Sequence, residues 1–440
     1  MMAVETPTAV EPFSALMTQQ GAHPLAGDRQ AAFARYAAKG LPTTRDEAWK
    51  YTSLAPLARL TLMRATAGGT VASSTLRDLC FGDTDFTEVV FIDGRFSSAM
   101  SNTATLPDGV FAGAFSAAPP SVIAAARERL AAPSCEAPLD ALNLALAEDG
   151  GLVFVPRDVR VARPIHLVFV TTRSDAPTAA HLRNAVVVEA GASATVIETY
   201  VTEDAGVYLT HSVTDVLAAE GARVDHIKVA REGREAWHLG AVRAQLAGHA
   251  ELNTFTVSTG GGVVRNELTA PMTAPETTCR ALGLFLLDGA QHCDNHLFID
   301  HAAPRCTSEQ VYRGILDGSS HGVFSGRVHV AVDAQKTDAQ QSCKNLLLSD
   351  DAQISTRPQL EIHADDVKCS HGVAIGSLDE TQYYYLRARG IGPREAREIL
   401  TYAFASELLG RIEVPAVRAD IERRISSAVA ADIAALTGDA

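Results

Sequence analysis

The sequence predicts a mainly β protein in which a strand-rich centre lies between two helical ends. From Leu152 to Gly376, short runs rich in Val, Ile, Thr and Phe alternate with small-residue turns, as successive strands do. Stretches with apolar residues at helical spacing come before and after this region. We therefore expect a mostly helical N-terminal domain over residues 1–150, a β core over 151–376 and a helical C-terminal domain over 377–440.

The N-terminal region contains three stretches with a helical pattern. Residues 25–40 are Ala-rich and end at Gly40-Leu41-Pro42, a typical helix stop. Residues 119–131 open with Pro–Pro, and residues 138–148 repeat leucine every three or four positions. Residues 89–96 are instead typical of a strand followed by a turn. This region is therefore mixed but mostly helical.

One type of turn recurs along the central region, and it suggests stacked repeats. Gly tolerates the positive φ of such turns at little steric cost. A β-solenoid, in which each coil covers the apolar face of its neighbour, is the simplest geometry. A β-sandwich would give similar spacing, so the pattern alone leaves both architectures open. The turns centre on positions 191, 221, 248, 289, 318 and 351.

The C-terminal residues return to a helical pattern. Ser377-Leu-Asp-Glu380 has the form of a capping box, and Pro393 and Gly410 are suited to the start and end of a second helix. Pro415 opens a third, amphipathic helix. Such helices either cover the open edge of a solenoid or present a docking face.

Composition restricts the class of protein. The formal net charge of −14 disfavours nucleic acid and acidic membranes as partners. The first 20 residues carry Glu5 and Glu11 without a long apolar run, so we expect no signal peptide. No stretch approaches the roughly 18–20 apolar residues of a membrane span. The seven dispersed cysteines fit a reducing compartment. A cytoplasmic protein is the expectation.

Three groups of Cys and His residues could carry chemistry. In the first, His292, Asp294 and His296 share one face of a predicted strand and Cys293 takes the other. This row could bind a metal ion, but a hydrogen-bonded polar ladder is the more common arrangement. No nucleotide-binding loop, serine nucleophile elbow or Cys-x-x-Cys motif is present, so no catalytic machinery is expected.

The second group runs from Glu361 to His371. If this stretch is extended, Glu361, His363, Asp365, Cys369 and His371 all project to one side. Thiolate, imidazole and carboxylate together suit iron. A polar solenoid face with an inert Cys is an equally good interpretation of these residues.

The third group is Cys343 alone, in Gln341-Ser-Cys343-Lys-Asn-Leu-Leu-Leu348. Its neighbours are typical of a buried strand, which favours a packing role.

Several motifs resemble the SufB/SufD family of the SUF iron–sulfur cluster assembly system. The resemblance runs in order from about Pro42 to Phe404 and is densest between His301 and Gly390. Cys369-Ser-His371-Gly stands where SufB-type sequences carry an acid–His–acid pattern, so the match favours the SufD branch. The motifs are Pro42-Thr-Thr-Arg-Asp-Glu-Ala-Trp-Lys-Tyr-Thr52, His301-Ala-Ala-Pro304, Tyr312-Arg-Gly-Ile-Leu-Asp317, Phe324-Ser-Gly326, Asp333-Ala-Gln-Lys-Thr-Asp-Ala-Gln340, Leu346-Leu-Leu-Ser349 and Asp365-Asp-Val-Lys-Cys-Ser-His-Gly372.

The resemblance implies a right-handed parallel β-helix between helical end domains, and a scaffold rather than an enzyme. It implies pairing with a SufB paralogue through the β-helix and docking of the SufC ATPase on helices over residues 378–411. Iron acquisition and cluster formation would take place at the SufB–SufD interface, with iron or the cluster bound transiently and no cofactor held tightly by the isolated chain. His371 is the first candidate ligand there and Cys369 its neighbour. Cys343 falls where SufB-type sequences have their cluster-building cysteine, and we hypothesise that it adds a third ligand or a sulfur acceptor.

Two other functions fit a β-helix. Polysaccharide lyases bind acidic sugars along such a fold, although they are usually secreted. A structural homo-oligomer without a metal role would instead form a stable self-dimer.

Overall fold

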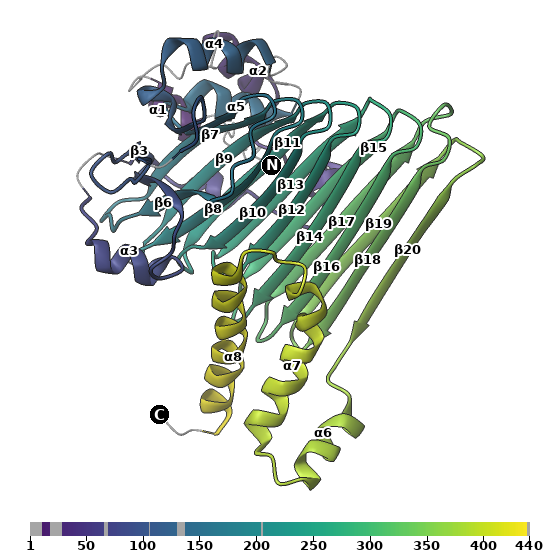
Figure 1. The fold of residues 1–440 in the computed structure, drawn as a ribbon. Helices are drawn as coiled ribbons and strands as arrows, with labels where there is room; N and C mark the ends of the chain where they lie inside the picture. Colours follow the sequence, from purple (N-terminus) through teal and green to yellow (C-terminus); the bar gives the residue numbers. More distant parts are fainter. Residues whose placement is uncertain are drawn as a thin grey trace, which may run out of the picture.

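The structure, a computed structural model, describes residues 11–17, 29–65, 69–104, 106–129, 137–203 and 206–437. Cys135 and the predicted helical residues 25–28, 130 and 131 lie outside this part of the chain. The described residues form a two-sheet parallel β-solenoid with helical parts at both ends of the chain (Figure 1). The predicted mainly β fold is therefore confirmed, and the solenoid replaces the sandwich.

From β5 onward, strands with odd numbers lie in one sheet and strands with even numbers in the other, because the chain alternates between the two sheets. Along this core each strand pairs in parallel with the strand two places further on, as stacked coils require. A β-sandwich would instead be built from antiparallel neighbours.

The first sheet, called sheet A, has its strands in the spatial order β19-β17-β15-β13-β11-β9-β7-β5-β4, with β1 beside β7. Its strands are β1 Met63–Arg64, β4 Phe111–Ala114, β5 Gly151–Val155, β7 Thr178–Val188, β9 Tyr208–Ala218, β11 Ala236–Leu246, β13 Val263–Met272, β15 His292–His301, β17 His321–Val330 and β19 Gln353–Ile362.

The second sheet, called sheet B, runs in the order β20-β18-β16-β14-β12-β10-β8-β6-β2-β3. Its strands are β2 Thr87–Ile92, β3 Arg95–Phe96, β6 Ile165–Thr171, β8 Ser193–Thr202, β10 Arg223–Arg231, β12 Glu251–Ser258, β14 Thr278–Leu287, β16 Thr307–Leu316, β18 Asp338–Leu347 and β20 Lys368–Gly376. The predicted strand and turn at residues 89–96 are β2, a turn at Asp93-Gly94 and β3.

The hydrophobic core fills the space between the two sheets. Alternate residues of each strand point inward, so Val196 and Val224 of sheet B join Val216 and Val242 of sheet A in one cluster. This stacking explains why the central sequence is rich in β-branched residues, which pack well on a pleated surface.

The predicted glycine turns form corners of the solenoid. Gly191, Gly221, Gly289 and Gly318 adopt positive φ, as expected. A Cβ at position 318 would lie 2.7 Å from the Gly289 nitrogen, so stacked corners leave no room for a side chain. The turn near 248 differs, because His249 takes the positive φ and not Gly248. At the last predicted corner, Asp351 does not adopt positive φ.

Of the N-terminal helices, α3 packs on the outer face of sheet B, where Leu76 joins a cluster with Val168 and Ile197, and the others cover part of the outer face of sheet A. Their apolar side chains pack with Ala179, Leu209 and Leu239, which point outward from β7, β9 and β11. The bounds of the N-terminal helices are α1 Glu11–Met17, α2 Arg29–Lys39, α3 Ser73–Leu79, α4 Pro120–Arg129 and α5 Pro138–Leu146, with short 3₁₀ turns η1 Glu47–Trp49, η2 Leu57–Arg59 and η3 Phe115–Ala117.

The C-terminal helices are α6 Glu380–Ala388, α7 Pro393–Leu409 and α8 Pro415–Thr437. Helices α7 and α8 pack on the outer face of sheet B, where Leu408 and Ile421 join a cluster with Phe255 and Leu282. One of the two expectations for these helices was that they cover the open edge of the solenoid. They do not cover it (Figure 1). The predicted capping box at Ser377 is also wrong, because Asp379 caps α6 by accepting from the Thr381 and Gln382 amides.

We expect the free energy of unfolding to fall as the pH is lowered from about 6.5 to 4.5. Burial lowers the pKa of His211 to about 3 and the pKa of His292 and His301 to about 4. Below about pH 6.5 the unfolded histidines bind protons that the folded ones reject, at a cost of about 2 kcal/mol each near pH 5. Urea unfolding at pH 7 and pH 5 measures the loss.

The carboxylates with a lowered pKa do not account for a fall in the free energy of unfolding between about pH 6.5 and 4.5. The pKa of Glu198 and of Glu267 is lowered to about 2, and depressed carboxyls lose their contribution only below about pH 4.5. His301→Gln should flatten the pH dependence, whereas His249→Gln, at an exposed histidine, should leave it unchanged. Equal urea midpoints at the two pH values would contradict this expectation.

Candidate functional site

Strand β20 is the last strand of sheet B and has an open edge (Figure 1). The Lys368 amide donates to the carbonyl of Thr337, the residue before β18, and this bond fixes which residues of β20 bond to β18. Since alternate residues of a parallel strand bond to the same neighbour, the backbone groups of Cys369, His371, Val373 and Ile375 point away from β18. Within the described residues no strand pairs with this edge. The edge therefore offers a row of free donors and acceptors.

Cys369 and His371 lie side by side on the inward face of β20. Their register partners on β18 are Ala339 and Gln341, which are both buried. Cys369 is half-buried and packs against the apolar cluster around Ala339, whereas His371 is exposed. The two side chains are accessible because, in the described part of the chain, no further coil stacks on this end of the solenoid.

The same inward face of β20 carries two exposed apolar side chains. Val373 is 39% and Ile375 is 51% exposed, although both occupy positions that are buried on the preceding coils. On the preceding coils, the next coil covers these positions. The exposed inward face of β20 therefore has the composition of an interface.

Cys343 lies on β18, one strand inside Cys369 and His371. It is 1% exposed and belongs to the main core cluster, beside Tyr312 on one side and Val373 on the other. The Asn345 side-chain amide donates to its sulfur at 3.3 Å. Burial raises the pKa of the Cys343 thiol to about 12, so it is protonated at neutral pH. Metal ligation by Cys343 would require β20 to move away from β18.

The structure separates the second predicted group into two places. Glu361 is the last residue but one of β19 and lies beside His329 on the outward face of sheet A, with His363 next to it. The chain then turns a corner before β20. Cys369 and His371 therefore belong to sheet B and face the interior of the solenoid. The prediction that all five residues project to one side is therefore wrong, because the stretch is not one continuous strand.

The first predicted group is a hydrogen-bonded ladder. Asp294 forms a buried ion pair with Arg265 and accepts from the Thr52 hydroxyl at 2.6 Å, and His292 lies 2.9 Å from the same hydroxyl. The Arg265 guanidinium stacks 3.8 Å from the centre of the Trp49 ring. The segment from Trp49 to Thr52 therefore anchors the N-terminal region to sheet A, and these polar groups are used for that contact.

Comparison with known proteins identifies the family. Residues 11–167 match the model of the SufBD protein N-terminal region, and residues 169–404 match the SufBD core domain of SUF-system iron–sulfur cluster assembly. The chain belongs to the SufBD family. The resemblance read from the motifs is thereby confirmed.

Relatives of this family match most of the chain. The iron–sulfur cluster assembly protein SufD of Escherichia coli is 32% identical over 390 residues, which are 88% of this chain and 89% of SufD. A SufBD family protein of Synechocystis is 30% identical over 91% of this chain and 90% of its own length. The chloroplastic protein ABCI7 of Arabidopsis thaliana is 31% identical over 84% and 78% of the two chains.

Membership of the SufBD family assigns the protein to iron–sulfur cluster assembly in the SUF system. Within the described residues, no helix has the length and apolar run that crossing a membrane requires.

Sequence reasoning named Glu361 and His363 as candidate ligands but missed Asp300 and His329, which lie beside them. Asp300, His329 and Glu361 are register neighbours on β15, β17 and β19. They are separated by about one coil along the chain, so no local motif reveals them. Aligning the sequence on the turns centred at 289 and 318 would have placed Asp300 and His329 in one column.

Proposed function

We propose that this protein is a non-catalytic scaffold subunit of the SUF complex, and that it contributes Cys369 and His371 to a nascent iron–sulfur cluster at an interface with a SufB-type paralogue. One observation carries the proposal. A thiol and an imidazole lie next to each other on an uncovered last coil, at positions where other coils bury their side chains.

The backbone of β20 supports pairing with a second solenoid at this edge. An open, apolar strand edge is a liability in a protein that stays single, and native proteins usually blunt such edges. Strand β19, the edge strand of sheet A, is protected from such pairing. Pro358 lacks the backbone amide that would otherwise point away from β17 toward a partner strand. Strand β20 contains no proline. A partner strand would therefore add to β20.

Thiol and imidazole chemistry fits a transient site. Partial burial raises the pKa of the Cys369 thiol, so this group is protonated in the isolated chain at neutral pH. Iron or a cluster precursor would displace the proton and bind the thiolate. A covering subunit would then exclude water and oxidant from the forming cluster.

Cys343 is proposed as a further sulfur acceptor or ligand that acts only when the end coil opens. Its place behind Val373 makes this a later step than ligation by Cys369 and His371. An ATPase that moves the paired solenoids could supply such an opening.

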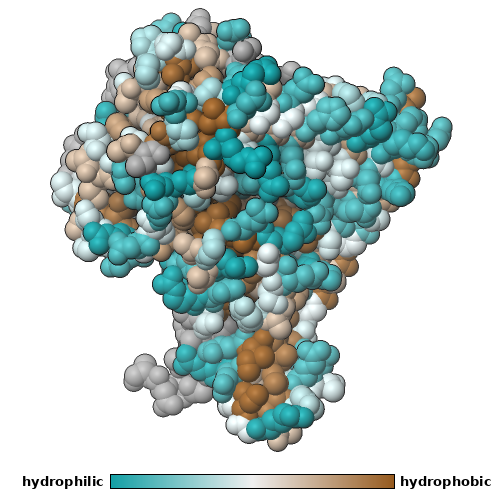
Figure 2. All heavy atoms as spheres, in the orientation of Figure 1, coloured by the Kyte–Doolittle hydropathy of each residue, from teal (hydrophilic) through white to brown (hydrophobic). Residues whose placement is uncertain are grey.

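The C-terminal helices are the proposed docking surface for the SufC ATPase. Helix α6 has no buried side chain and exposes Tyr384 and Tyr385, and α7 exposes Ile399 and Tyr402. Figure 2 shows an apolar area over these helices at the end that projects away from the sheets. An unburied helix of this kind is typical of a surface that a partner covers.

We also place the protein in the cytoplasm. The six cysteines in the described residues are free thiols, which fits a reducing compartment.

The test is co-expression with a SufB-type paralogue and the SufC ATPase, followed by anaerobic reconstitution with iron and sulfide. A complex that contains all three chains and a visible-absorbing cluster is the expected result. A stable self-dimer that ignores both partners would support a structural homo-oligomer instead. Cleavage of polyuronate by the purified chain would support a lyase.

A further inference from the structure

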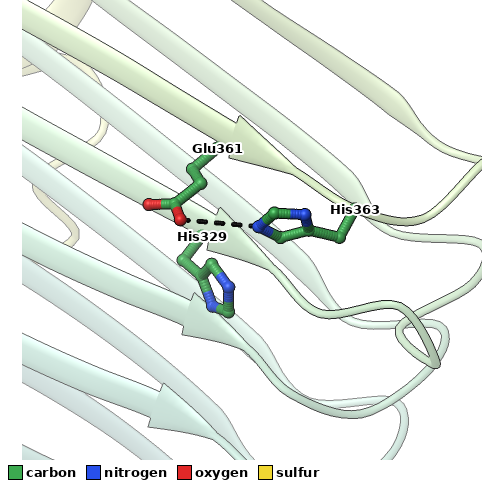
Figure 3. Close-up of side chains that lie close together, drawn as sticks. All are labelled: His329, Glu361 and His363. Atoms are coloured by element: carbon green, nitrogen blue, oxygen red, sulfur yellow. Dashed lines mark hydrogen bonds and ion pairs between the residues drawn. The ribbon is translucent and has the colours of Figure 1, made fainter.

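A second group of metal-binding residue types lies on the outward face of sheet A, near the same end of the solenoid. His329 is the last residue but one of β17, Glu361 is its neighbour on β19, and His363 follows two residues later (Figure 3). Asp300 is the neighbour of His329 on the other side, in β15. Cys369 and His371 face the interior from the opposite sheet, so the two groups are separate.

The two histidines and the glutamate converge. One ligand atom from each of His329, Glu361 and His363 can be chosen so that all three lie within 4.8 Å of one another. His363 Nε2 is 3.4 Å from Glu361 Oε1, and the ring centres of His329 and His363 are 5.5 Å apart. These side chains are at the surface, so small rotations would close the three atoms around an ion.

Asp300 orients the imidazole of His329. The distance between its Oδ1 and His329 Nδ1 is 2.6 Å, which is a hydrogen bond that Nδ1–H donates. With the proton held on Nδ1, Nε2 carries the lone pair that a metal would take. A carboxylate bonded to the far nitrogen of a ligating histidine is a common support of metal sites.

Arg327 orients the carboxylate of Glu361 in a similar way. Its guanidinium donates to Glu361 Oε2 at 2.7 Å and stacks 5.1 Å from the centre of the Phe298 ring. Oε1 is left to face His363. Hydrogen bonding to Arg327, and then to His363, lowers the pKa of Glu361, so this ligand is ionised at neutral pH.

The geometry points to a binding site for one divalent transition-metal ion, with His329, Glu361 and His363 as ligands and Asp300 as the positioning residue. Two imidazoles and a carboxylate suit borderline ions such as Fe²⁺, Co²⁺ and Zn²⁺, whereas Mg²⁺ and Ca²⁺ prefer all-oxygen shells. Water completes the coordination shell, because the site is open on one side.

The surface of the chain provides a matched control. His249 Nδ1 is 3.2 Å from Glu276 Oε2, and Arg305 donates to the other oxygen of that carboxylate at 2.6 Å. This His–Glu–Arg arrangement copies His363, Glu361 and Arg327. Among the described residues, however, a group of three metal-binding side chains forms only around His329.

The experiment is a titration of the full chain with Co²⁺ alone, read by d–d absorption and by equilibrium dialysis. The chain carries Cys369→Ser and His371→Ala, so that the proposed cluster site does not contribute and its failure is scored separately. We expect one equivalent of Co²⁺ without thiolate charge-transfer bands. His329→Ala and His363→Ala should each lower the affinity at least about tenfold, and Asp300→Asn about tenfold.

The variant His249→Ala should bind Co²⁺ as the parent does. The proposal is overturned if the parent binds no stoichiometric Co²⁺, or if His329→Ala and His363→Ala bind as tightly as His249→Ala. Circular dichroism establishes that each variant is folded, which is expected because none of the substituted side chains is fully buried.

Discussion

Replacing His371 with alanine is expected to lower the yield of cluster in the reconstituted three-chain complex at least about tenfold, because outer-shell changes alone cost metal sites about 10–100-fold. Association of the chains should be unchanged, since His371 is exposed and its backbone pairing does not depend on the imidazole. Cluster absorbance after anaerobic reconstitution, at equal complex concentration, is the measurement.

Two further variants are compared with His371→Ala. His249→Ala removes an exposed histidine far along the chain and should assemble clusters normally. Cys343→Ser tests the buried thiol, and an undiminished yield would assign Cys343 to core packing. A normal yield from His371→Ala would remove His371 from the cluster site.

Replacing Val373 with proline is expected to weaken pairing with the paralogue at least about tenfold, because a buried interface loses a backbone donor and meets the proline ring. The Val373 amide points away from β18, so the fold of the chain should survive the change. Affinity for the SufB-type subunit, measured by biolayer interferometry, gives the size of the effect.

Thr356→Pro is the matched control. Thr356 stands on β19 with its amide also directed at the open edge, but this strand already contains Pro358 two residues later. Pairing should be retained in this variant. If Val373→Pro bound the paralogue as tightly as the unmodified chain, β20 would not be the pairing edge.

The elements of the fold were largely predictable from local sequence. Runs of β-branched residues predicted the strands, and glycines that adopt positive φ predicted four of the corners. Which strands become neighbours was not predictable, because parallel and antiparallel pairing use the same residue types. The N-cap of helix α6 also differed from the prediction. The Asp379 side chain, and not Ser377, accepts hydrogen bonds from the first amides of this helix.

The site was predictable only where its residues are close in sequence. Cys369 and His371 are two residues apart on one strand, so they share a face whatever the architecture. Their separation from Glu361 depends on a corner that no residue pattern marked. Asp300 and His329 meet only through stacking of coils, which local reasoning cannot supply.

The central claim is that a sister subunit covers Cys369, and thiol alkylation tests it most directly. In the isolated chain, Cys369 should be labelled faster than Cys343, whose sulfur is buried and serves as the internal reference. Peptide mass spectrometry should show that assembly with the SufB-type subunit slows labelling of Cys369 at least about tenfold. An unchanged labelling rate in the complex would contradict the account.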